Sequence, residues 1–167
     1  MANHCRNASV ICSMKRIVLL ITVCCTIITL GAQHSSAQSK KRSAAEWKKV
    51  LTPDQYEILV EKGTEPAYHN AYWNNHEKGV YVSAATGDIL FTSDDKYDSH
   101  TGWPSFVKSV DPSKIAIVQD NSYGMVRDEV IEKSTGLHLG HVFDDGPANR
   151  GGKRYCMNSG ALKFIKK

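Results

Sequence analysis

Short apolar runs separated by turn-forming residues dominate the second half of the chain. They lie at residues 79–83, 88–92, 115–118, 125–131, 139–143 and 161–165, and each is rich in β-branched or aromatic residues. Asp-Pro, Asn-Ser and glycine-rich segments separate these runs, and residues 84–87 (AATG) predict a hairpin turn. Short strands at this spacing predict a mainly β domain of the α+β class with antiparallel strands.

Two capping boxes predict short helices before the first strand. Residues 43–46 (SAAE) have the Ser-x-x-Glu pattern, which predicts a helix around Trp47. Residues 52–55 (TPDQ) repeat the signal with proline at the first helical position, and Gly63 is a natural stop. We interpret both as packing elements at the N-terminal edge of the domain.

A longer apolar run, Ile17–Leu30, follows a basic pair near the N-terminus. Ser35 and Ala37 then stand at the −3 and −1 positions of a signal-peptidase site. This layout predicts a secretory signal peptide over residues 1–37, because the run is shorter than the ~20 apolar residues of a membrane span. An uncleaved membrane anchor is the alternative, and Met14 is a candidate for the true start. We therefore expect an exported protein, periplasmic or secreted, without stable membrane association after cleavage.

The remaining chain is long enough for one ordinary domain. Residues 38–42 are polar and basic and predict a disordered linker, so the domain is expected to span residues 43–167. The net charge of +4 is modest, and much of it lies in that linker and at the C-terminal lysine pair. Because no basic stripe is interleaved with aromatic residues, we expect no nucleic-acid partner.

The cysteines are unevenly distributed between the predicted signal peptide and the predicted domain. Cys156 is the only one in the domain, and the predicted signal peptide holds the other four, Cys5, Cys12, Cys24 and Cys25. The mature protein can therefore form no internal disulfide. Export usually goes with paired cysteines, so we interpret this single thiol as retained for reactivity. A buried structural cysteine is the alternative.

The neighbours of Cys156 suit a reactive thiol. Arg154, Cys156 and Asn158 occupy alternate positions, so in an extended strand their side chains share a face. A guanidinium and a carboxamide beside the thiol are expected to favour the thiolate, which is the nucleophilic form. Two histidines, His138 and His141, stand three residues apart upstream.

Three chemistries can use these residues. The first is thiol redox chemistry on Cys156, in which the histidines, Arg154 and Asn158 transfer protons and stabilise charge. The second is Cys-His hydrolysis of an acyl substrate, in which Arg154 stabilises an oxyanion. The third is a metal site built from His138, His141, Cys156 and one of the acids Asp144 and Asp145. A metal would stand beside the Arg154 cation, which is unfavourable.

An aromatic loop at residues 101–106 (TGWPSF) interrupts the strand pattern. Trp103 precedes proline and is therefore held extended, which presents its indole with little conformational freedom. Two roles are considered for this side chain: filling the core, and contacting a ligand.

Three motifs in order carry a specific resemblance. They are GWPSF at 102–106, HLGHVFDDGP at 138–147 and RYCMNS at 154–159. In this order the chain resembles the methionine sulfoxide reductase B family, and the likeness runs from about Trp47 to Phe164. The resemblance implies a fold of two antiparallel sheets and stereospecific reduction of methionine-R-sulfoxide. In this lesion a flexible apolar side chain has become polar and chiral, so the expected role is repair of oxidised proteins under oxidative stress.

The resemblance also implies roles for individual residues. Cys156 matches the nucleophile that attacks the sulfoxide sulfur and becomes a sulfenic acid, while a protonated group delivers a proton to the departing oxygen. His141 and His138 match the family's histidines, and Arg154 and Asn158 match the polar residues beside the cysteine. The predicted substrate-binding residues are Trp103, against which the S-methyl group packs, Phe106 and Asp145.

Two departures from the family pattern change the expectations. Many members hold zinc with two Cys-x-x-Cys pairs, but the matching residues here are Ser83 with Thr86, and Glu132 with Thr135. None is a soft ligand, so we expect no zinc and no other cofactor. A resolving cysteine often precedes GWPSF, where this chain has Thr101. An external thiol is therefore expected to reduce the sulfenic acid directly: a thioredoxin-like protein, a partner domain or a small thiol.

The combined prediction is an exported, one-cysteine, zinc-free methionine-R-sulfoxide reductase. A Cys-His hydrolase and a non-catalytic binding domain are the alternatives.

Overall fold

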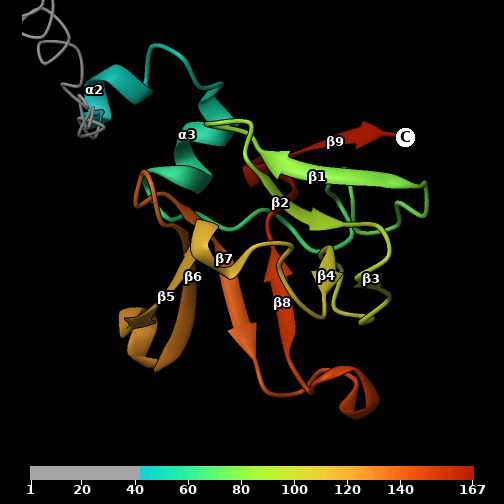
Figure 1. Ribbon diagram of the computed structural model, residues 1–167. Coiled ribbons are helices and arrows are strands. Elements are labelled where there is room, and N and C mark those ends of the chain that lie inside the picture. Colours follow the sequence, from blue (N-terminus) through green and yellow to red (C-terminus); the bar gives the residue numbers. More distant parts are fainter. Residues whose placement is uncertain (1–41) are drawn as a thin grey trace, which may run out of the picture. The chain divides into compact units, whose positions relative to one another are not determined.

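The computed structural model describes residues 42–167, shown in colour in Figure 1. The predicted signal peptide (1–37) lies outside the described residues, as does the predicted linker (38–42) except for its last residue. None of the helices in the described part is long and apolar enough to cross a membrane.

Two α-helices, α2 (Ala44–Trp47) and α3 (Pro53–Leu59), precede the strands in the described residues. The strands are β1 (Gly79–Ser83), β2 (Ile89–Thr92), β3 (Lys96–Tyr97), β4 (Ser105–Phe106), β5 (Ile115–Asp120), β6 (Arg127–Glu132), β7 (His138–Phe143), β8 (Arg154–Met157) and β9 (Leu162–Lys166). Short 3₁₀ turns between them are η1 (Pro112–Lys114), η2 (Ser122–Gly124), η3 (Ala148–Arg150) and η4 (Ser159–Ala161).

Both predicted capping boxes are present. The Ser43 hydroxyl accepts the backbone N–H of Glu46, and the Glu46 carboxylate accepts the backbone N–H of Ser43, which begins α2. The second box begins α3 in the same way, between Thr52 and Gln55. These reciprocal bonds satisfy amide groups that the first helical turn leaves unpaired.

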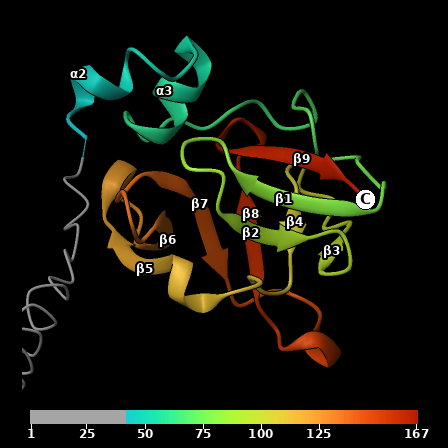
Figure 2. The ribbon, with the colours of Figure 1, turned by 45° about the horizontal axis from the view of Figure 1, so that its top comes forward.

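The strands form two antiparallel sheets, which confirms the predicted fold class. One has the order β2-β1-β9 and the other β3-β4-β8-β7-β6-β5. Figure 2 shows β1, β2 and β9 grouped together, apart from β5, β6 and β7 of the larger sheet. All six predicted runs lie in strands, with small differences at their ends. The two-residue strands β3 and β4 were not predicted, because so short a segment carries no alternating pattern.

Aromatic side chains from both sheets meet in the core. Phe106 of β4 stacks on Phe91 of β2 with ring centroids 4.4 Å apart, and contacts Tyr81 of β1 edge-on at 5.0 Å. All three side chains are fully buried. The contacts fix the smaller sheet against the centre of the larger one, where β4 and β8 pair.

Candidate active site

A row of directly opposed residues crosses the larger sheet and contains the single thiol. Opposed residues in an antiparallel pair project to the same face, so the side chains in this row share one side of the sheet. From β4 to β5 the row is Ser105, Cys156, His141, Glu129 and Val118. Strands β7 and β8 lie side by side in Figure 1, and their pairing sets His141 directly beside Cys156.

A bulge in β7 brings the second histidine to the same face. Side chains three apart in a regular strand point to opposite faces. Here Val130 pairs with Gly140 and Ile131 pairs with His138, so one extra residue is inserted in β7. The rings of His138 and His141 consequently lie 5.3 Å apart in an edge-to-face arrangement.

Gly140, inside the bulge, permits the close approach of β8. A Cβ at this position would lie 2.2 Å from the carbonyl oxygen of Cys156. Only glycine therefore fits here without displacing the backbone that carries the thiol.

The Cys156 side chain is half-buried and lines a cavity of about 120 Å³. Trp103, His141 and Asn158 line the same cavity. The Thr101 hydroxyl lies 4.0 Å from the sulfur atom. Burial raises the pKa of the Cys156 thiol, and this outweighs the opposing effects of the Arg154 charge and nearby hydroxyl groups. The neighbours of Cys156 therefore lower its pKa, as predicted, but burial raises the pKa by more than they lower it.

Arg154 is held by a bidentate pair with Asp145. Its Nε and Nη2 atoms donate to the two carboxylate oxygens at 2.8 and 2.7 Å, and its guanidinium lies 4.3 Å from the Phe143 ring centroid. The pairing lowers the pKa of Asp145. Asp145 orients Arg154 and does not line the Cys156 cavity, and its contact with substrate stays a prediction.

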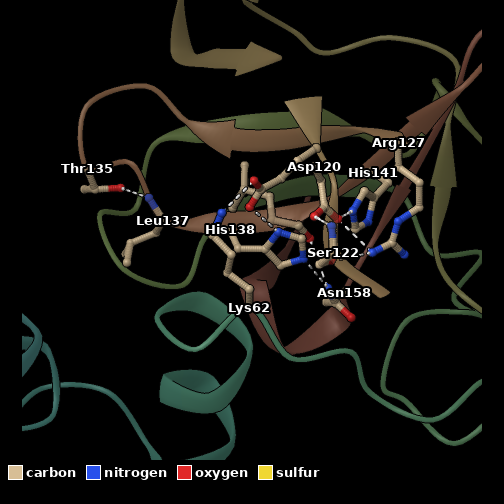
Figure 3. Close-up of polar contacts among 11 residues, drawn as sticks. Lys62, Asp120, Ser122, Arg127, Thr135, Leu137, His138, His141 and Asn158 are labelled. Carbon is tan, nitrogen blue, oxygen red and sulfur yellow. Dashed lines mark hydrogen bonds and ion pairs between the residues drawn. The ribbon is translucent and has the colours of Figure 1, made fainter. Parts of the chain in front are cut away.

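Asp120 holds His141. Its Oδ2 atom lies 2.9 Å from Nε2 of His141 and accepts a bond of 2.7 Å from Nη2 of Arg127 (Figure 3). The backbone N–H of Ser122 donates to the other oxygen at 2.9 Å. These bonds hold the pKa of Asp120 far below its usual range, and those from Ser122 have the largest effect. The carboxylate beside His141 is therefore ionised.

His138 belongs to a second, more deeply buried chain of contacts. Its Nδ1 lies 2.8 Å from Glu129, whose other oxygen accepts the Lys62 ammonium at 2.8 Å. Its Nε2 lies 3.5 Å from Nδ2 of Asn158. Burial lowers the pKa of His138 although Glu129 opposes this effect, which favours the neutral ring. His141, and not His138, lines the Cys156 cavity.

The indole of Trp103 also faces this cavity. Its Nε1 donates to the backbone carbonyl of Glu65 at 3.0 Å, and the Glu65 carboxylate accepts the backbone N–H groups of Ser159 and Gly160. These bonds fix the ring relative to the end of β8. Phe106, three residues later, is fully buried and does not line the cavity. The prediction that Phe106 contacts substrate is therefore corrected: it is a core residue.

Several residues around the site were not predicted from the sequence. Arg127 and Glu129 alternate in a predicted strand, which is a weak signal for a shared polar face. Asp120 and Lys62 carry no local signal, because long-range pairing alone brings them to the histidines.

The family's metal positions hold a hydrogen-bonded cluster. Glu132 is fully buried and accepts the hydroxyls of Thr86 and Thr135 at 2.5 and 2.7 Å. The Ser83 hydroxyl accepts two backbone N–H groups of the following turn. Three neutral hydroxyls and one carboxylate already engaged with them do not fit a zinc ion. Among residues 42–167, no group of three or more histidine, cysteine or acidic side chains could hold a metal ion.

Comparison with known proteins agrees with this geometry. The family model for the SelR domain matches residues 51–166. A peptide methionine sulfoxide reductase MsrB of Methanosarcina barkeri is 52% identical over 124 residues, covering 74% of this chain and 87% of that protein. Another, from Leptospira interrogans, is 51% identical over 125 residues, covering 75% and 95%. The chain therefore belongs to the SelR domain family, in which these MsrB proteins are its relatives.

Proposed function

We propose that this protein is an oxidoreductase that reduces methionine-R-sulfoxide to methionine, with Cys156 as its nucleophile. One observation carries the proposal: Cys156 and His141 are direct cross-strand partners that share a cavity with the Trp103 indole. Relatives about half identical to this chain are named peptide methionine sulfoxide reductases, which supports reduction of methionine sulfoxide.

The reaction is a two-electron transfer of oxygen from substrate to enzyme. The deprotonated Cys156 sulfur attacks the sulfoxide sulfur, and the departing oxygen accepts a proton. The sulfur–oxygen bond of the substrate breaks and the protonated oxygen leaves as hydroxide, which leaves the Cys156 sulfur bonded to the substrate sulfur. Hydroxide then attacks the Cys156 sulfur and breaks this sulfur–sulfur bond, so methionine leaves and Cys156 becomes a sulfenic acid. The thiol loses two electrons and the sulfoxide gains two, so no other redox partner takes part in this step.

His141 is the proposed proton donor to the sulfoxide oxygen. Its cross-strand position beside Cys156 and its place in the cavity support this role. The ionised Asp120 carboxylate, bonded to Nε2, orients the ring. His138, which is buried behind it and held by Glu129, is proposed as a positioning residue.

Arg154 and Asn158 are proposed to act on either side of the thiol. The Arg154 charge lowers the pKa of Cys156 and so offsets part of the burial effect. Asn158 lines the cavity, and its side-chain bonds to Leu139 and Glu65 keep β7 and the loop after α3 in register with the thiol.

Recovery of the enzyme is proposed to use external thiols. One thiol attacks the Cys156 sulfenic acid and releases water, and a second reduces the mixed disulfide, which returns Cys156 to the thiol and leaves an external disulfide. Cys156 is the only cysteine within the described residues, which supports this route. A thioredoxin-like protein fits the role chemically.

Two further features complete the proposal. The N-terminal sequence pattern supports export to a periplasm or outside the cell after cleavage at Ala37. The Glu132 cluster supports a protein that folds and acts without zinc. The expected role in that compartment is repair of oxidised proteins.

The decisive test is turnover of a single sulfoxide epimer. The purified protein, with dithiothreitol as reductant, should convert methionine-R-sulfoxide to methionine and leave the S epimer unchanged. Cys156→Ser should retain the fold and lose this activity, because serine is too weak a nucleophile towards sulfoxide. Retained reduction in that variant would remove Cys156 from the mechanism. Turnover of esters or amides in its place would indicate a Cys-His hydrolase.

A further inference from the structure

Three hydroxyl groups form a continuous chain beside the Cys156 sulfur. The Oγ atom of Ser99 lies 2.9 Å from Oγ1 of Thr101 and 2.7 Å from Oγ of Ser105. Thr101 ends the chain on one side, with its hydroxyl oxygen 4.0 Å from the sulfur atom. Ser105 ends it on the other side, and this fully buried residue is the direct cross-strand partner of Cys156.

The hydrogen bonds of this chain have two possible directions. Each hydroxyl has one proton and rotates to suit its surroundings. In one direction the protons point away from the sulfur, and Ser105 donates to the backbone carbonyl of Trp103 at 3.3 Å. In the other direction they point towards the sulfur, and Thr101 donates to it. Rotation of the three hydroxyls exchanges the two directions, and no proton is transferred.

Ionisation of Cys156 favours the direction towards the sulfur. A thiol is a weak donor and a weak acceptor, whereas a thiolate accepts a charge-assisted hydrogen bond. Successive donors in a chain polarise one another, so the bonds behind Thr101 strengthen the bond that it makes. The bond given up is the one from Ser105 to Trp103, and at 3.3 Å it is the longest oxygen–oxygen bond of the chain.

The charged groups around Cys156 leave a need for such a donor. The ionisable side chains come from its own strand, the neighbouring strands, the cavity wall and the loop of Thr101: Arg154 paired with Asp145, His141, Arg127 paired with Asp120, Tyr97, and the largely exposed Asp98 and His100. Both arginines are thus engaged with carboxylates. Burial raises the pKa of the Cys156 thiol in spite of the Arg154 charge. An uncharged donor that stabilises the thiolate therefore has a direct effect on its reactivity.

The loop that carries Thr101 is held by contacts outside the hydroxyl chain. The backbone carbonyl of Gly102 accepts the N–H of Tyr68 at 2.9 Å and Nδ2 of Asn70 at 2.7 Å. The Tyr68 hydroxyl donates to the carbonyl of His100 at 2.6 Å. A separate segment thus fixes the backbone on both sides of Thr101. The three hydroxyls are therefore not needed to hold the loop, which leaves their contact with the sulfur as the reason for their arrangement.

We infer that the Thr101 hydroxyl, aligned by Ser99 and Ser105, donates a hydrogen bond to the Cys156 thiolate and is a further catalytic group. Ser99 and Ser105 are positioning residues, because they supply the donors behind Thr101. The inference rests on the proposed function and adds how a buried thiol ionises for the attack on the sulfoxide.

The test measures the pH midpoint of Cys156 alkylation by iodoacetamide, followed at this residue by peptide mass spectrometry. It uses the full chain as its expression host processes it. Thr101→Val keeps the shape of the side chain but removes the hydroxyl, and should raise the midpoint by about one pH unit, or about tenfold less thiolate at neutral pH. Its kcat/KM for methionine-R-sulfoxide at neutral pH should fall to a similar extent. Ser99→Ala should raise the midpoint by a smaller amount.

Two variants serve as controls. Thr101→Ser keeps a hydroxyl and should keep the wild-type midpoint, and so should Ser109→Ala, at a buried serine outside the chain. An unchanged midpoint in Thr101→Val or in Ser99→Ala, in an enzyme that reduces the sulfoxide, would overturn this inference alone. Equal shifts in Thr101→Val and Thr101→Ser would also overturn it, because altered packing would then be the cause. Absence of sulfoxide reduction in the wild-type protein would overturn the proposed function, and the catalytic role of Thr101 with it.

Discussion

Thr101 presents its hydroxyl oxygen 4.0 Å from the sulfur of Cys156. A disulfide bond is about 2.05 Å long, so a sulfur atom at position 101 would need only a small approach to reach Cys156. Thr101→Cys should therefore give the enzyme an internal resolving thiol. After one turnover without reductant, this variant should contain an intramolecular disulfide, whereas the wild-type protein should carry a sulfenic acid that dimedone labels.

Mass spectrometry of the protein after a single turnover checks this prediction. The double variant Thr101→Cys/Cys156→Ser serves as control and should form neither product. Persistent dimedone labelling of Cys156 in Thr101→Cys would contradict the proximity of the two positions.

The Cys156 thiol should have a higher pKa than an ordinary cysteine. Burial raises its pKa, so at neutral pH the reactive thiolate is a smaller fraction than in an exposed cysteine and grows only as pH rises through that higher value. The rate of iodoacetamide alkylation against pH measures this directly. The same protein unfolded in guanidinium is the reference, with a midpoint near the ordinary ~8.5. Arg154→Met should move the folded midpoint higher, because the opposing charge is lost; a folded midpoint below the unfolded one would contradict the burial argument.

Asp120→Asn should impair the chemical step more than binding. The amide retains the shape of the side chain but removes the charge that pairs with His141 and Arg127. We expect kcat to fall by at least about tenfold, a part of the ~10²–10⁴ that a well-placed acid contributes. Steady-state kinetics separates kcat from KM. Asp128→Asn, at the next exposed carboxylate along the hairpin, is the control and should behave as wild type. Equal losses in both variants would point to a general charge effect.

The Glu132 cluster should stabilise the fold without metal. Thr86→Val and Thr135→Val each remove a hydroxyl that donates to the buried carboxylate, and each should lower the free energy of unfolding by about 1–3 kcal/mol. Denaturant unfolding measures this loss. EDTA should leave the wild-type unfolding midpoint unchanged, and metal analysis should find zinc far below one ion per chain. Stoichiometric zinc would refute the zinc-free proposal.

Much of the architecture and the centre of the site could be predicted from local pattern. The capping boxes at Ser43 and Thr52 predicted α2 and α3, because a cap is a contact between residues three apart. The alternation of Arg154 and Cys156 predicted their shared face, because a strand has a period of two residues.

Tertiary structure decided everything that depends on contacts between distant segments. The bulge opposite Val130 turns His138 to the face of His141, although a regular strand would separate them. Asp120 reaches His141 only through the β5-β6-β7 pairing. Phe106 was predicted from its motif to contact the substrate, but it lies in the core. The pKa of the Cys156 thiol is raised by burial. Burial and register are properties of the packed sheets, so no short stretch of sequence contains them.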